Sequence, residues 1–159
     1  MEEENNNINE DVSDIPMPDD HPQLQEIEDE FEGAYKFAIV GVGQGGSRIA
    51  ETFWNLGYRR VCVINTAKQD LKYINIPEDR KLLLDHGGAG KDPETAEKIF
   101  EENAEEIWDF FHEKLGTSYD RVLVCAGAGG GTGAGGGPAA FKIIKDNTSA
   151  TVGFVSALP

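Results

Sequence analysis

Residues 127–138 read GAGGGTGAGGGP, with eight glycines in the eleven positions that end at Gly137. Each glycine costs backbone entropy on folding, and a plain turn between a strand and a helix needs only one or two. A nest of backbone amides around a polyphosphate accounts for the excess, with the Thr132 hydroxyl as a further donor. No lysine follows at the spacing that a Walker A loop requires. We therefore interpret the run as a phosphate-binding segment rather than a flexible low-complexity linker.

The sequence on both sides of this run alternates between strand and helix patterns. Short apolar runs predict five strands, at residues 37–40, 61–64, 81–85, 121–125 and 151–156. Periodicity and helix-end signals predict helices over residues 47–57, 92–115 and 135–146. Continuously apolar strands separated by helices indicate a parallel sheet that is covered on both faces. We therefore predict an α/β fold, a Rossmann-like parallel sheet with helices on both faces.

A second glycine-rich segment, GVGQGG at residues 41–46, follows the first predicted strand. Glycines there let backbone N–H groups approach an anion, and the N-terminus of the next helix adds partial positive charge. The segment also satisfies GxGxxG, the dinucleotide-binding pattern, which requires an acidic residue about 20 positions later. The second predicted strand ends in Asn65 and Thr66 instead. This difference, together with the run at residues 127–138, disfavours a nicotinamide-dependent oxidoreductase.

Charge divides the chain into two parts. Residues 1–34 contain 13 acidic residues and no lysine or arginine, whereas residues 35–159 contain 16 acidic and 14 basic residues. The first part has few apolar residues to offset the entropy of ordering, so we predict a disordered acidic tail over residues 1–34. The formal net charge of −15 argues against nucleic-acid binding, which requires a basic face. With two cysteines, no membrane-spanning run and no secretory signal, we expect a reducing, cytoplasmic location.

The segment GGGTGAG at residues 129–135 resembles the GGGTG[ST]G signature of the tubulin/FtsZ family of polymerising GTPases. The other segments follow in the family's order: residues 41–48 resemble its first nucleotide loop, residues 65–71 the segment after its second strand, and residues 87–94 its third loop. Gln44, Arg48, residues 65–68 and residues 157–159 are most similar to the archaeal CetZ branch. The resemblance covers residues 35–159 and identifies them as a nucleotide-binding domain.

The resemblance implies a site for GTP or GDP with Mg²⁺, and head-to-tail filaments in which the next subunit completes the hydrolytic site in trans. It assigns nucleotide contacts to Gly43, Gln44, Gly45, Gly46, Arg48, Asn65, Thr66, Gly88, Ala89, Gly90, Lys91, Gly127, Gly129, Gly130, Gly131, Thr132 and Gly133. It assigns no catalytic residue, because the family's activating loop lies downstream of residue 159. We therefore expect a truncated domain that hydrolyses GTP poorly and leaves a sheet edge and a hydrophobic face uncovered.

Two functions stay open at this point. One is the GTP-binding domain of a cytoskeletal, filament-forming GTPase, and the other is a non-catalytic nucleotide-binding cap or regulator of such filaments. No metal ligand is assigned, because capping of a helix is the favoured role for Asp92. Cys62 and Cys125 are predicted to be buried, inert thiols. His86 borders the third loop and is interpreted as an ordinary loop histidine.

Overall fold

The computed structural model describes residues 35–84 and 87–159. Five strands form one parallel sheet in the order β3-β2-β1-β4-β5. They are β1 (Phe37–Val42), β2 (Val61–Asn65), β3 (Lys81–Leu83), β4 (Arg121–Gly127) and β5 (Thr151–Ala157). The predicted Rossmann-like sheet is therefore confirmed. The acidic tail predicted over residues 1–34 and the interpretation of His86 lie outside the described residues.

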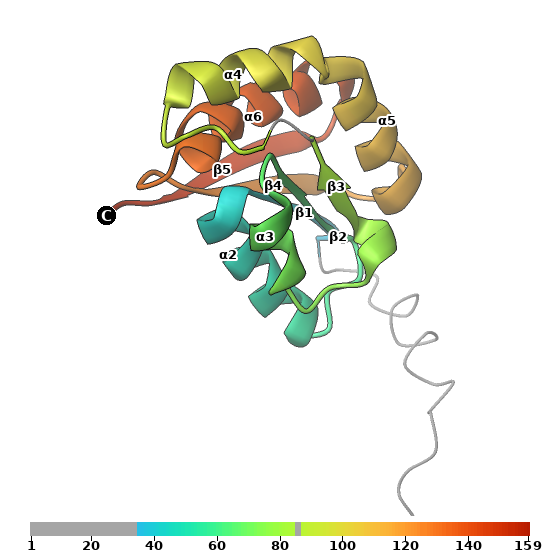
Figure 1. The fold of residues 1–159 in the computed structure, drawn as a ribbon. Helices are drawn as coiled ribbons and strands as arrows, with labels where there is room; N and C mark the ends of the chain where they lie inside the picture. Colours follow the sequence, from blue (N-terminus) through green and yellow to red (C-terminus); the bar gives the residue numbers. More distant parts are fainter. Residues whose placement is uncertain (1–34, 85–86) are drawn as a thin grey trace, which may run out of the picture. The chain divides into compact units, whose positions relative to one another are not determined.

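Helices cover both faces of this sheet (Figure 1). On one face lie α2 (Gly43–Asn55) and the short α3 (Lys68–Lys72), which sequence periodicity did not reveal. On the other face lie α4 (Pro93–Glu102), α5 (Ala104–Leu115) and α6 (Gly137–Asn147). A 3₁₀ turn, η2 (Glu78–Arg80), leads into β3. The described helices are all too short or too polar to cross a membrane.

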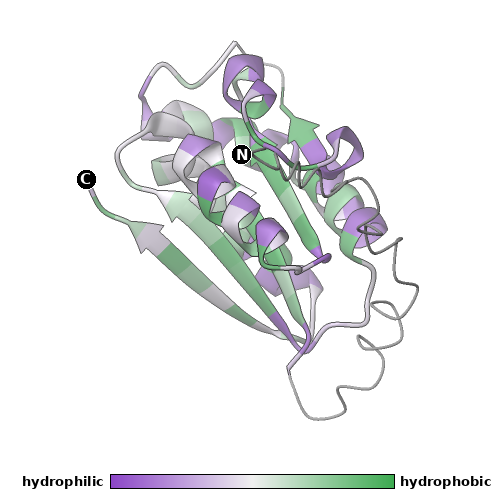
Figure 2. Cartoon of the chain, turned by 90° about the horizontal axis from the view of Figure 1, so that it is seen from below, coloured by the Kyte–Doolittle hydropathy of each residue, from purple (hydrophilic) through white to green (hydrophobic). Residues whose placement is uncertain are grey.

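Two hydrophobic cores lie on opposite faces of the sheet, because successive side chains of a strand point to opposite sides. Ile39 and Val63 face the core that α2 and α3 complete, whereas Val40 and Cys62 face the core beneath α4, α5 and α6. These strand residues are all fully buried. Burial on both sides explains why the strands are continuously apolar, and Figure 2 shows hydrophobic residues concentrated along them.

The prediction of a single helix over residues 92–115 is wrong in one respect. The helix is interrupted at Asn103, which separates α4 from α5. Asn103 leaves helical geometry, with φ −111° and ψ 22°, and its side-chain Nδ2 donates to the Ile99 carbonyl at 2.7 Å. Phe100 before the break and Ile107 after it are both fully buried. The apolar stripe therefore continues across the break and conceals it from periodicity.

The second half of the glycine run is helical and closely packed, which corrects its interpretation as a phosphate nest throughout. The π-helical turn η3 (Thr132–Gly136) leads directly into α6. A Cβ on Gly135 would lie 1.9 Å from the Pro93 carbonyl oxygen, and one on Gly136 would lie 2.5 Å from the Phe100 ring. These two glycines therefore let η3 approach α4 more closely than any side chain would permit.

β5 forms one edge of the described sheet. Among the described residues β5 pairs only with β4. Phe154 and Val155 in this strand are 40% and 41% exposed. An apolar edge strand of this kind presents unpaired backbone groups next to exposed apolar side chains.

Candidate functional site

A cavity of about 480 Å³ lies at the carboxyl ends of the parallel strands, where open α/β sheets bind ligands. Segments that follow β1, β2, β3 and β4 all contribute to its lining. The lining residues are Gln44, Gly45, Ala67, Asp70, Gly88, Ala89, Gly90, Lys91, Gly127, Gly129, Gly130, Gly131, Thr132 and Gly133. The topology therefore brings the four sequence segments together at one site.

The segment after β1 turns directly into α2. Gly43 has φ +69°, and a Cβ there would lie 2.7 Å from the Gly133 backbone nitrogen. A Cβ on Gly46 would lie 2.1 Å from the Cys125 carbonyl oxygen, so the first turn of α2 packs directly against β4. No side chain caps this helix, and its first turn contains no acidic residue. Its N-terminal amides therefore keep their capacity to bind an anion.

The segment after β2 is held by a buried asparagine. Asn65 Oδ1 accepts the N–H groups of Thr66 at 2.8 Å and Ala67 at 3.2 Å. The hydroxyl of Thr66 lies 2.7 Å from that of Thr132, which joins this segment to the glycine run. Asn65 Nδ2 is buried and has no hydrogen-bond partner among the described residues. Asn65 and Thr66 are fully buried behind the cavity lining, which suits them to fix its shape.

The third loop lies against both neighbouring segments. The Gly88 N–H donates to the Thr66 carbonyl at 2.9 Å, and a Cβ on Gly131 would lie 2.8 Å from the Asp92 nitrogen. Lys91 has φ +64°, a left-handed conformation that is uncommon for a residue with a side chain. Lys91 is also the one basic residue among the described residues that line the cavity. The loop thus places the positively charged Lys91 at the cavity, at a position where the backbone conformation is constrained.

Asp92 caps α4, as predicted. Its carboxylate accepts the N–H groups of Glu94 at 3.2 Å and Thr95 at 3.3 Å. The Thr95 hydroxyl also donates to this carboxylate, and this hydrogen bond is the main reason why the pKa of Asp92 lies below its ordinary value. Asp92 does not line the cavity.

Arg48, a predicted nucleotide contact, is held by other groups of the protein. Its Nη1 donates to Glu51 Oε2 at 3.0 Å and to the Tyr73 carbonyl at 2.9 Å, and Arg48 does not line the cavity. Burial raises the pKa of Glu51, but hydrogen bonds from the Asn75 N–H and from Arg48 outweigh it and lower the pKa overall. Arg48 therefore connects α2 to the segment after α3. Gly43 and Gly46 are also predicted contacts that do not line the cavity, and both are buried.

Two lining residues, Ala67 and Asp70, are missing from the predicted set. Asp70 lies in the first turn of α3, and its place in the segment after the second strand was the signal that could have found it. It is the single carboxylate among the lining residues, and the described residues contain no group of three or more metal-ligating side chains. Mg²⁺ commonly takes one or two protein carboxylates and fills its other positions with phosphate oxygens and water. Asp70 and the Thr132 hydroxyl fit such an ion.

Comparison with known proteins assigns the fold to a family. A family model described as the GTPase domain of the Tubulin/FtsZ family matches residues 36–159. The chain belongs to the tubulin/FtsZ family. This tubulin/FtsZ chain is 37% identical over 140 residues to Cell division protein FtsZ 2 of Haloferax volcanii, a match that covers 84% of this chain and 33% of that protein.

Two solved structures show the same family relationship. CetZ1 from Haloferax volcanii, described as a GDP-bound monomer, gives a TM-score of 0.73 at 31% identity over 78% of this chain and 42% of that one. CetZ2 from the same organism, described as a GTPγS-bound protofilament, gives 0.66 at 26% identity over 76% and 39%. These structures support the predicted similarity to the CetZ branch. The chain spans about a third of the length of the curated relatives that it matches.

Proposed function

We propose that residues 35–159 bind GTP or GDP with Mg²⁺ in the cavity at the carboxyl ends of the strands. This proposal rests on one observation: glycine residues make up much of the cavity lining, so backbone groups are exposed there. Gly129 and Gly130 are exposed there, and a Cβ on Gly130 would meet nothing within 4 Å. A surface made of amides, beside a helix N-terminus without a side-chain cap, suits a chain of phosphates.

Each segment has a separate role in this proposal. The amides after β1 and those of residues 129–131 hold the phosphates, with the Thr132 hydroxyl as an additional donor. Lys91 places positive charge at the third loop, beside the terminal phosphate. Asp70 holds Mg²⁺, which neutralises phosphate charge when it is bound. Asn65 and Thr66 lie behind the cavity lining and hold the loop after β2 in place through their hydrogen bonds.

We further propose that the protein is cytoplasmic, assembles head to tail and hydrolyses GTP only when a second subunit completes the site. Among the residues that the structure describes, the cavity lining contains no histidine and one carboxylate, that of Asp70. A carboxylate that holds Mg²⁺ does not act as a general base, so in this proposal the water-activating group comes from outside the described lining residues. The protofilament described for CetZ2 of Haloferax volcanii supports the assembly part of this proposal.

Calorimetric titration with GTP, GDP, ATP and NAD in Mg²⁺ buffer tests nucleotide binding. We expect GTP and GDP to bind. Gly130→Ala adds only a methyl group in open space, whereas Gly130→Asp adds a negative charge beside the phosphates, so the aspartate variant should bind far more weakly than the alanine variant. Thermal melting of the two nucleotide-free variants controls for folding. Preference for NAD, or equal binding by the two variants, would contradict the proposal.

The second candidate is a non-catalytic cap or regulator, and the presence of one carboxylate among the described lining residues favours it over a self-sufficient enzyme. Phosphate release measured over a range of protein concentrations separates the two candidates. Hydrolysis in trans predicts a specific rate that rises with protein concentration as subunits assemble. A cap predicts nucleotide binding with no hydrolysis and no sedimentable polymer at any concentration.

A further inference from the structure

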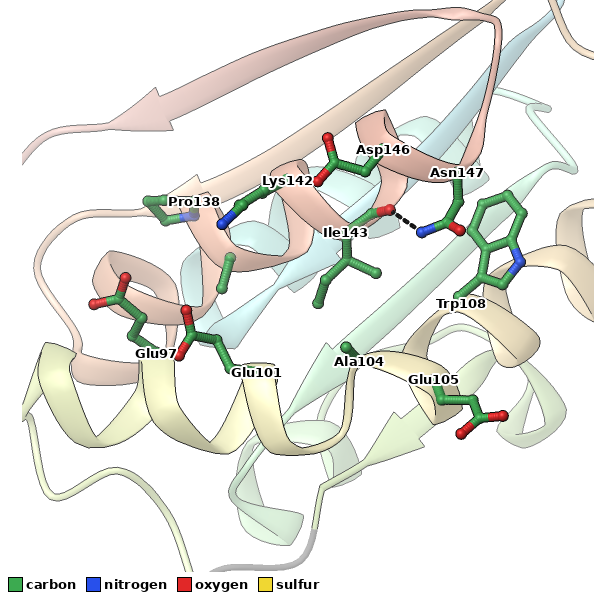
Figure 3. Close-up of a pocket in the computed structure, with 11 residues that line it drawn as sticks. Glu97, Glu101, Ala104, Glu105, Trp108, Pro138, Lys142, Ile143, Asp146 and Asn147 are labelled. Carbon is green, nitrogen blue, oxygen red and sulfur yellow. Dashed lines mark hydrogen bonds between the residues drawn. The ribbon is translucent and has the colours of Figure 1, made fainter.

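A groove separate from the phosphate cavity lies between α4–α5 and α6. It encloses about 710 Å³ and shares no lining residue with the phosphate cavity. Figure 3 shows residues of α4 and α5 along one wall and residues of α6 along the other. The groove therefore has no role in the nucleotide site proposed above.

The groove follows from the glycine packing described for η3. Gly135 lets η3 touch α4 at the Pro93 carbonyl, so the two helical walls begin in close contact. Further along α6 the residues carry full-sized side chains, and α5 changes direction after Asn103. The groove lies beyond this close contact, alongside α6 as far as Asn147.

The inner surface of the groove is apolar. Ala104 and Ala139 are small residues that leave space, while Trp108 and Ile143 form the sides. The Trp108 ring stacks on Phe111 with the ring centroids 5.5 Å apart, which holds the indole in place. A preformed apolar surface of this kind accepts a large side chain with little loss of side-chain entropy.

The rim of the groove is negatively charged. Glu97 and Glu101 on α4 and Glu105 on α5 lie along one wall, and Asp146 lies on the other. Among the described lining residues the one cation is Lys142, on the same wall as Asp146. Within residues 35–84 and 87–159 none of these acidic residues forms an ion pair. An unneutralised acidic rim around an apolar floor is complementary to a segment that is apolar on one face and basic at its edges.

We propose that this groove binds an amphipathic helix of a partner protein. A large apolar side chain of the helix enters between Trp108 and Ile143, and lysine or arginine residues flank it along the acidic rim. The ten positions of α6 from Pro138 to Asn147 span roughly 15 Å at 1.5 Å per residue, which matches about three turns of the partner helix.

Fluorescence anisotropy with model peptides tests the proposal on the intact chain. The probe is a labelled helical peptide of leucine and lysine with its leucines on one face, and its control is a peptide of the same composition in scrambled order. At about 0.15 M salt, long-range attraction to the acidic chain is largely screened. We expect the amphipathic peptide to bind at least tenfold more tightly than the scrambled one.

Two charge-reversal variants make the test specific to the groove. Glu101→Lys reverses a charge on the rim, whereas Glu102→Lys makes the same change in the same helix at a residue outside the groove. We expect Glu101→Lys to weaken peptide binding about tenfold and Glu102→Lys to leave it unchanged. Equal effects of the two variants, or equal binding of the two peptides, would overturn the proposal.

Sedimentation of the chain alone tests the alternative occupant of the groove, which is a second copy of the same chain. A dimer that Glu101→Lys abolishes and Glu102→Lys preserves would assign the groove to self-association and would overturn the proposal of a partner helix. A monomer that still binds the amphipathic peptide supports it. Thermal melting of both variants shows whether lost binding reflects lost folding.

Discussion

The hydroxyl groups of Thr66 and Thr132 lie 2.7 Å apart and join the segment after β2 to the first residue of η3. We expect Thr66→Val, which keeps the shape of the fully buried side chain, to lower the free energy of unfolding by about 1 kcal/mol. Nucleotide binding should also weaken, because Thr132 loses the partner that orients it. Urea unfolding and calorimetry measure the two effects. Thr52→Val, which removes an exposed hydroxyl on α2, should change neither quantity appreciably.

Gly135 is expected to be among the least tolerant positions of the glycine run. A methyl group there would lie 1.9 Å from the Pro93 carbonyl, so Gly135→Ala must separate η3 from α4. Overpacking of this kind costs about 1–3 kcal/mol, and we expect a loss at the upper end of that range because backbone atoms have to move. Urea unfolding measures the loss. The matched variant Gly130→Ala places its methyl group in open space, and an equal loss there would contradict the packing role of Gly135.

The cap of α4 should contribute a pH-dependent part of stability. The folded-state pKa of Asp92 is lowered by its hydrogen bond from Thr95, so the stabilisation is present above the unfolded-state pKa of about 4 and is lost as pH falls through the folded-state value. An asparagine side chain at this position would accept the same backbone N–H groups without titrating. We therefore expect the urea midpoint of Asp92→Asn to fall less steeply below about pH 4 than that of the parent chain. Asp109→Asn, which removes an exposed carboxylate elsewhere, should follow the parent; a parallel curve for Asp92→Asn would contradict the prediction.

Both cysteines should be inert in the folded protein. Burial raises the pKa of the Cys62 thiol to about 12 and that of Cys125 to about 11, and both side chains are fully buried. Because the thiolate is the nucleophile, we expect no reaction with a disulfide reagent near pH 8, about where a free thiol reacts readily. Both thiols should react in urea, which the absorbance of the released chromophore measures. Rapid labelling of one thiol in the native protein would show that its strand opens.

The strands and the place of the site follow from sequence patterns that have a direct physical cause. A strand buried on both faces must be continuously apolar, so β1, β2 and β4 were predictable. Glycine segments after strands indicate ligand contact, and the cavity is lined by most of the residues assigned from them. Membership of the tubulin/FtsZ family could also be inferred from the sequence, because four segments follow one another in the family's order.

Other features depend on tertiary contacts that local patterns do not express. The break at Asn103 interrupts no apolar stripe, and α3 is too short to display a period. Arg48 lies in a nucleotide-like segment but is held by Glu51 and the Tyr73 carbonyl, which no spacing rule indicates. Composition alone also does not separate a glycine that faces the cavity from one that faces Phe100.

The two kinds of glycine in one run have a consequence for comparing this chain with distant descendants of the same ancestor. Gly135 and Gly136 are required by the contact between η3 and α4, so a lineage that abandoned nucleotides would still retain them. Gly129 and Gly130 have room for a side chain, so under the proposed function the ligand alone constrains them, and they would be released from selection once it was lost. Substitutions at these two positions, with Gly135 and Gly136 intact, are therefore the evolutionary signature of a family member that has kept its fold and given up its nucleotide.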